Sequence, residues 1–285
     1  MPRHIVTFAK TSVAIEYPPG KISALIEFLY RHIESNSEVP VSDTIQIIHH
    51  AEPEPEWHIV RRDITIARAS SVEELAAPLV EETLQRVAEP HRAGLAFHAA
   101  ALSRRGLGIL VPGQSGAGKS SLAAWLTAHG FNYLGDELTV VEPDRNMDAF
   151  TRPIKIKTSG VAALQTLIDI RAHQARLLRS GATIMIPHKL LNPQSTRESA
   201  FLSLIVFPHY RAQAELTLTP LSAAKTGLAL MECLVNARNL AGHGFGAAAT
   251  MVREVSAFRL DYGGFEQLEA LLPWFRRPPP VPPQG

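Results

Sequence analysis

The chain has very little cysteine, no excess of charge of either sign and no long apolar run. Cys233 is the one cysteine among 285 residues, which excludes an intramolecular disulfide and fits a reducing cytoplasm. Lysine and arginine number 28 against 27 acidic residues, a net charge of +1, so nothing indicates a surface for nucleic acid. No apolar run approaches the length of a membrane helix, and no signal-peptide pattern is present. We expect a cytoplasmic protein without nucleic-acid or membrane partners.

The length allows one large α/β domain, or a medium one with a smaller partner. The patterning favours the second arrangement. We assign residues 1–90 to a small α+β domain, residues 91–276 to a larger α/β domain, and residues 277–285 to a proline-rich, disordered tail.

The first 90 residues contain short alternating segments and two helical patterns. Residues 44–48 and 63–67 predict half-exposed antiparallel strands. Residues 21–32 predict a helix. A second helix is expected to begin at Ser71, which forms a capping pair with Glu74, and Pro78 is expected to kink or shorten it.

The larger domain begins with two apolar runs, at residues 95–102 and 106–111, that predict a hairpin. Further strands are expected near 132–134, 138–141, 154–156, 184, 201–207, 214–219 and 256–260. Helices are expected over 161–178, 221–240 and 265–272.

A glycine-rich loop follows the hairpin and has the phosphate-binding pattern G-x-x-x-x-G-K-[ST]. The apolar run 108–111 predicts a strand before it, and residues 120–126 predict a helix after it. Glycines let backbone N–H groups turn toward an anion, and the helix adds the positive end of its dipole. The residues expected to bind nucleotide phosphates are Gly113, Ser115, Gly116, Ala117, Gly118, Lys119, Ser120 and Ser121.

Two residues of this loop have specific expected roles. Lys119 would reach the β- and γ-phosphates, and the Ser120 hydroxyl would ligate Mg²⁺. The chain contains no Asn-Lys-x-Asp sequence for reading guanine, so ATP is favoured over GTP. The expected cofactors are therefore ATP and Mg²⁺.

Candidate catalytic residues lie on both sides of the loop. Asp136 and Glu137 follow a short apolar stretch that we expect to be a strand beside the strand leading into the loop, which would bring both carboxylates to the phosphates. Phosphoryl transfer needs a held Mg²⁺, compensating charge and a group that positions the attacking oxygen. His98, expected on the first strand of the hairpin, could orient the carboxylate or the acceptor hydroxyl, or carry a proton.

Together these residues resemble a known family. Phe97-His98-Ala99-Ala100-Ala101, the glycine loop, and Leu134-Gly135-Asp136-Glu137 are similar to the nucleotide-binding core of the HPr kinase/phosphorylase family. The similarity is greatest to the HPr-kinase-related serine kinases, which include those that modify lasso-peptide precursors. It covers about residues 94–142 and implies a P-loop kinase core of the HPr kinase/carboxykinase type. It also implies Asp136 as base or positioner, Glu137 as the metal-side partner with Ser120, and His98 as an activating histidine.

The chain departs from that family at two places. It has Asp-Glu where the bifunctional enzymes have paired aspartates, and Ile154-Lys155-Ile156-Lys157 where a Glu-x-Arg-Gly signature is expected. These departures argue against phosphorylase activity and against HPr as the substrate.

Several cationic side chains follow the acidic pair, and their pattern is compatible with two roles. Arg152, Lys155 and Lys157 could offset charge near the γ-phosphate or belong to a solvated strand face. Arg238 is better explained by pairing with the dipole at the end of its expected helix.

The sequence thus predicts an ATP- and Mg²⁺-dependent kinase that phosphorylates a hydroxyl of a peptide, protein or small molecule. One alternative is a nucleotide-binding regulatory protein that transfers nothing. Another is a carboxykinase-like lyase, which would need basic residues and a second metal site that the sequence does not reveal. The sequence does not identify the acceptor or the role of residues 1–90. It also leaves the oligomeric state open, and a homo-oligomer is one alternative.

Overall fold

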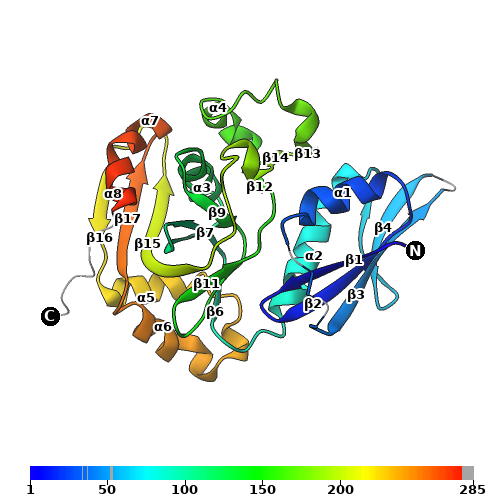
Figure 1. The fold of residues 1–285 in the computed structure, drawn as a ribbon, viewed down its shortest axis with the longest axis horizontal. Coiled ribbons are helices and arrows are strands. Elements are labelled where there is room, and N and C mark those ends of the chain that lie inside the picture. The colour runs from blue at the N-terminus through cyan, green and yellow to red at the C-terminus, as the bar shows by residue number, and fades with distance from the viewer. Residues whose placement is uncertain (34, 37, 52–53, 278–285) are drawn as a thin grey trace.

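The computed structural model describes residues 1–33, 35–36, 38–51 and 54–277. It shows a mixed α/β protein with several sheets, as the sequence predicted (Figure 1). The tail expected at 277–285 lies outside the described residues, apart from Arg277.

The N-terminal sheet contains strands in the order β1-β2-β3-β4-β5. Their bounds are β1 Arg3–Phe8, β2 Thr11–Glu16, β3 Val41–His50, β4 Glu56–Arg61 and β5 Ile64–Ala69. Helix α1 (Lys21–Tyr30) connects β2 to β3, and this crossover makes the pair parallel, whereas only antiparallel strands were expected. Both α1 and α2 (Ala76–Ala88) lie on the side of the sheet that faces the rest of the molecule (Figure 1).

The start of α2 shows the expected capping pair in a modified form. The Glu74 amide donates to Ser71 Oγ at 3.3 Å, but the Glu74 carboxylate accepts from the Ser70 amide at 3.0 Å. A 3₁₀ turn covers residues 73–75 before the α-helix begins. Pro78 therefore falls in the first turn of α2, where its missing N–H costs no helical hydrogen bond, and it does not interrupt the helix.

The larger sheet has the order β6-β10-β11-β15-β8-β7-β9, with β17 paired to β15 and β16 paired to β17. The strands are β6 Leu95–Phe97, β7 Ala99–Arg104, β8 Leu107–Pro112, β9 Asn132–Gly135, β10 Thr139–Val141, β11 Asn146–Ala149, β15 Ala200–Tyr210, β16 Thr217–Pro220 and β17 Ser256–Tyr262. The hairpin predicted before the glycine loop is β7–β8.

Strand β8 lies inside this sheet, between β15 and β7. Ile109 and Val111 pack in the core cluster that contains α3, and Leu110 packs in the cluster that contains α5 and α6. Because both faces are covered, the strand needs a continuous apolar run. The expectation that β9 lies directly beside β8 is wrong, since β7 pairs with both strands and separates them.

Helices cover the sheets, and a small third sheet has the order β12-β14-β13. The small sheet consists of β12 Ile154–Lys157, β13 Leu178–Ser180 and β14 Thr183–Ile186. The remaining helices are α3 Lys119–Ala128, α4 Val161–Leu164, α5 Ala223–Met231, α6 Phe245–Met251, α7 Phe265–Leu268 and α8 Leu272–Arg276. None of the helices within the described ranges combines the length and apolar character needed to cross a membrane.

The helix expected over 161–178 is wrong beyond Leu164, where α4 ends. Two features of the following residues explain the difference. Ile168 and Ile170 are both buried, a spacing of two that suits extended chain, and the Asp169 carboxylate accepts hydrogen bonds from the next turn.

The helix expected over 221–240 is also shorter, because α5 ends at Met231. Beyond it, the side chain of Asn236 is buried, accepts a hydrogen bond from the Ala96 amide at 3.0 Å and donates to the Gly94 carbonyl at 3.2 Å. These partners are far away in sequence, so tertiary hydrogen bonds override the local helical pattern.

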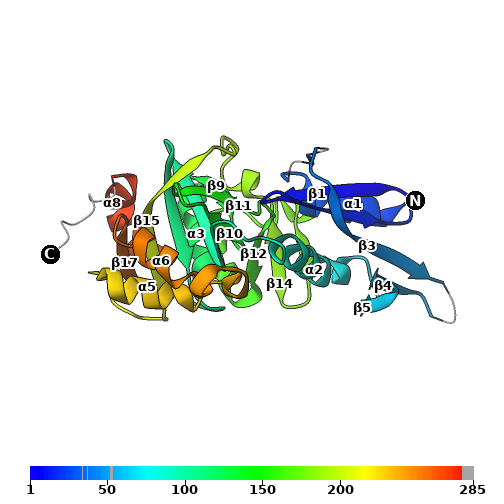
Figure 2. The ribbon, with the colours of Figure 1, turned by 90° about the horizontal axis from the view of Figure 1, so that it is seen from below.

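The N-terminal sheet and the larger sheet share one apolar core. Helix α2 lies between the two parts (Figure 2). Phe150 follows β11 and is fully buried. Its ring meets Phe8 edge-on at 5.7 Å between centroids, and Tyr30 edge-on at 6.4 Å. The two parts are therefore joined by packed aromatic rings as well as by the chain.

We predict that Phe150→Ala lowers the free energy of unfolding by about 3–5 kcal/mol, because it opens a cavity where the two parts meet. Urea unfolding followed by circular dichroism and tryptophan fluorescence measures the change. Phe245→Ala, at a position that is 65% exposed, is the matched control and should change stability by less than about 0.5 kcal/mol. Equal effects of the two substitutions would contradict the shared core.

Candidate active site

The glycine loop joins β8 to α3 and has a backbone that favours glycine. Gly113, Gly116 and Gly118 have φ values of 149°, 92° and 103°. A residue of β15 also holds the loop, because the Tyr210 amide donates a hydrogen bond to the Ala117 carbonyl at 3.0 Å. The predicted order of strand, loop and helix is observed, and the loop ends at the N-terminus of α3.

Gly118 also lies where a side chain has no room. A Cβ atom there would come within 2.5 Å of the Tyr262 hydroxyl and 3.1 Å of Tyr210 Cβ. The Tyr262 hydroxyl donates to the Gly118 carbonyl at 3.3 Å. Strands β15 and β17, which carry these tyrosines, thus fix the point at which α3 begins.

Lys119 is the first residue of α3 and its side chain is buried. Its Nζ donates to the carbonyls of Gly113 at 2.5 Å and Gln114 at 3.2 Å, so the lysine turns back along the loop. Burial lowers the pKa of Lys119, whereas Asp136 and Glu137 act in the opposite direction. The ammonium group is thus bonded to the loop and within electrostatic reach of the two carboxylates.

The other predicted phosphate-binding residues are all placed in the loop or in the first turn of α3. Ser115 and Gly116 are exposed at the tip of the loop, and Ser120 and Ser121 are half-buried in the helix. Lys157, at the end of β12, donates to Ser115 Oγ at 3.2 Å. This contact places the Lys157 ammonium group beside the tip of the loop, on an exposed side chain.

The acidic pair follows β9 and is held by Arg152. Arg152 Nη2 lies 3.0 Å from Asp136 Oδ1 and donates to Glu137 Oε2, and Nη1 donates to the Pro153 carbonyl at 3.0 Å. The Arg152 side chain is 2% exposed and the Asp136 side chain is 0% exposed. Burial acts to lower the pKa of Arg152, but the two carboxylates outweigh it and raise that pKa. The interpretation of Arg152 as part of a solvated strand face is therefore wrong, since its side chain is buried and paired with both carboxylates.

His98 sits at the bend between β6 and β7, not within a strand of the hairpin as expected. Its amide donates to the Cys233 carbonyl at 2.8 Å, which fixes the bend. Its Nδ1 lies 3.4 Å from Glu137 Oε1, and both side chains are 34% exposed. Burial and Lys119 lower the pKa of His98 against the effect of Glu137, so the imidazole is neutral at pH 7.

Glu137 is the member of the acidic pair that faces open space. Burial alone would raise the pKa of Glu137, but Arg152, with His98, lowers it. The carboxylate is therefore ionised at neutral pH. Asp136 is enclosed behind it, with the Lys155 amide donating to Oδ2 at 3.4 Å.

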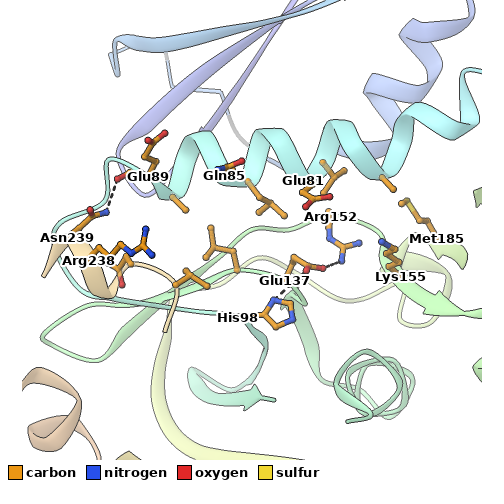
Figure 3. A pocket seen from close by; sticks show the side chains of 17 residues that line it. Glu81, Gln85, Glu89, His98, Glu137, Arg152, Lys155, Met185, Arg238 and Asn239 are labelled. Carbon is orange, nitrogen blue, oxygen red and sulfur yellow. Dashed lines mark hydrogen bonds and ion pairs between the residues drawn. The ribbon is translucent and has the colours of Figure 1, made fainter. Parts of the chain in front are cut away.

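A cavity of about 670 Å³ opens against this cluster (Figure 3). His98, Glu137 and Arg152 line one side of it, and α2 lines the other. Lys155 and Arg238 also line it. The role expected for Arg238 at the end of a helix over 221–240 does not apply, because α5 ends at Met231. The glycine loop and Asp136 are not part of its wall.

Sequence reasoning missed several residues that shape the site. These are Tyr210, Tyr262, Asn236 and Cys233, whose buried thiol lies beside the Gly113 amide. An arginine between the apolar residues Phe150 and Ile154 was a usable signal for Arg152. Nothing local marked the others, because their roles depend on contacts between distant segments.

Within the described residues, no group of three or more histidine, cysteine, aspartate and glutamate side chains is arranged to hold a metal ion. Mg²⁺ bound with a nucleotide needs only one or two protein ligands, since water and phosphate oxygens supply the rest.

No family model matches the chain, and no curated protein matches it. Among solved structures, the chain is similar to the HPr(Ser) kinase/phosphatase from Coxiella burnetii, with 13% sequence identity and a TM-score of 0.32. The match covers 64% of this chain and 95% of that one. The chemistry of the site therefore has to follow from its own residues.

We predict that Gly118→Ala destabilises the protein by about 1–3 kcal/mol more than Gly130→Ala, because only the first methyl group meets packed atoms. Gly130 is a matched control, since its φ is also positive, at 88°, and a Cβ there has nothing within 4 Å. Chemical denaturation of both variants gives the difference. Equal losses would show that Tyr262 does not press against the loop.

We further predict that Arg152→Met destabilises the protein by about 3–5 kcal/mol, because it leaves the buried Asp136 carboxylate without its cation. Adding Asp136→Asn should restore part of the loss, since the orphaned charge is then removed as well. Urea unfolding of the two variants is the measurement. A double variant no more stable than Arg152→Met would argue against the pairing.

Proposed function

We propose that this protein is an ATP-dependent kinase of the HPr-kinase-like type, which transfers the γ-phosphoryl group to a hydroxyl of a peptide, protein or small molecule. One observation carries the proposal. The glycine loop with Lys119 lies at the same edge of the larger sheet as Glu137, which pairs with Arg152 and His98. Phosphoryl transfer is mostly positioning and charge compensation, which is what these groups supply.

The sheet topology supports this pairing of loop and acids. Strand β7 is antiparallel to both β8 and β9, so β8 and β9 run in the same direction. Their carboxyl ends, which lead to the glycine loop and to Asp136, therefore share one edge of the sheet. Ligands of open α/β sheets bind at that edge.

The loop is suited to a triphosphate by its backbone and charge. Its glycine conformations and the N-terminus of α3 favour an anion, and Lys119 and Lys157 bring positive charge to the start and the tip of the loop. The lack of an Asn-Lys-x-Asp sequence favours ATP.

The residues present also fit Mg²⁺, because the ionised Glu137 and the half-buried Ser120 offer the oxygen donors that this ion prefers. When bound, Mg²⁺ would neutralise charge on the β- and γ-phosphates. Ser120 and Glu137 would hold it.

His98 and Glu137 would manage the acceptor. The neutral imidazole of His98 takes the proton of the acceptor hydroxyl as its oxygen bonds to the γ-phosphorus and the bond to ADP breaks. The Glu137 carboxylate beside Nδ1 stabilises the imidazolium that forms. Asp136 is buried and does not line the cavity, so we assign it the task of holding Arg152, and through it Glu137, in position.

Transfer from γ-labelled ATP tests the function. Wild-type protein should label an acceptor, and Lys119→Ala and Glu137→Gln should each lower kcat/KM by about 100-fold or more, as loss of one transition-state contact does. Lys225→Ala, an exposed position at the start of α5, is the matched lysine control and should match wild type. Labelling that survives Lys119→Ala contradicts the proposal. Nucleotide binding without any turnover would favour a regulatory protein instead.

A further inference from the structure

The cavity beside Glu137 has a wall that the nucleotide chemistry does not need. We propose that it is the acceptor site, that it takes an extended peptide segment carrying the reacting serine or threonine, and that Arg238 selects an acidic residue in that segment. This inference rests on the proposed kinase function and adds the class of acceptor and its selecting residue.

The position of the cavity suits an acceptor. His98 and Glu137 line it, whereas the glycine loop does not (Figure 3). A nucleotide on the loop and a peptide in the cavity would therefore reach the pair of His98 and Glu137 from separate compartments. Transfer requires the attacking and leaving oxygens on different sides of the phosphorus, and this arrangement provides it.

The dimensions of the cavity suit one extended chain. It runs along α2 from Ala77 to Glu89, which is 89 − 77 = 12 residue steps, or about 18 Å of helix. An extended chain at about 3.3 Å per residue would place about five residues there.

The walls suit alternating apolar side chains. Val80, Leu84 and Ala88 recur every four residues on the face of α2 that lines the cavity. Leu138 and Val235 line it from the larger domain. Val80, Leu84 and Ala88 also pack in or against the core that the two sheets share, so the cavity borders that core.

The positive charge of Arg238 lies at one end of the cavity and has no acidic partner among the described residues. Arg238 points into it (Figure 3) and forms no ion pair with any residue in the described part of the chain. Nearby Glu89 is engaged by Arg86 Nη1 at 2.5 Å. Asn239, next to Arg238, donates to the Glu89 carbonyl at 2.8 Å, which fixes this segment to the end of α2. A carboxylate of the acceptor would supply the missing partner.

A positional peptide library tests the inference. Each peptide has a central serine or threonine, and labelling from γ-labelled ATP reports the preferred flanking residues. Wild type should prefer aspartate or glutamate at one flanking position. Arg238→Glu should shift the acidic-to-basic ratio at that position by at least 10-fold toward lysine and arginine. Arg179→Glu, at an exposed site on β13, is the charge-reversal control and should keep the wild-type preference.

A second variant tests the position of the site. Ala88→Trp puts a large side chain into the cavity and should raise KM for the best peptide at least 10-fold. An acidic preference that survives Arg238→Glu, or an unchanged KM in Ala88→Trp, overturns the inference while leaving the kinase function standing. ATP turnover without labelling of any peptide also overturns it, since the acceptor is then not a peptide. If wild type neither binds nor turns over ATP, the proposed function itself fails.

Discussion

The guanidinium of Arg152 holds Asp136 and Glu137 together, and the geometry of the site depends on it. A buried cation is stable only where opposite charges compensate its lost hydration, and two carboxylates do so here. The same contact fixes which carboxylate is enclosed and which faces the cavity. It also keeps Glu137 ionised beside a neutral His98, the pairing that proton transfer from a hydroxyl requires.

This arrangement joins elements that are far apart in the sequence. The carboxylates end β9, the arginine precedes β12, the histidine lies at the bend between β6 and β7, and Asn236 ties the segment after α5 to that bend. The N-terminal sheet takes part as well, because α2 forms one wall of the cavity and Phe150 joins the two cores. The N-terminal residues thus form part of the wall beside Glu137.

Sequence reasoning located the parts of the site that depend on local chemistry. The glycine loop, the strand before it, the helix after it and the acidic pair follow from spacing and residue type. Arg152 was noticed, but its partners could not be chosen, since a cation after an acidic pair is compatible with a solvated face. The order of β8, β7 and β9 was misjudged because sequence neighbours need not be sheet neighbours.

The most direct measurement is a crystal structure with Mg²⁺ and a non-hydrolysable ATP analogue. Our account predicts the β- and γ-phosphates on the backbone amides between Gly113 and Ser120. It also predicts the metal in contact with Ser120 and with Glu137, directly or through one water, and Arg152 still between the two carboxylates. A nucleotide bound elsewhere, or a Glu137 side chain turned away from the terminal phosphate and the metal, would contradict the account.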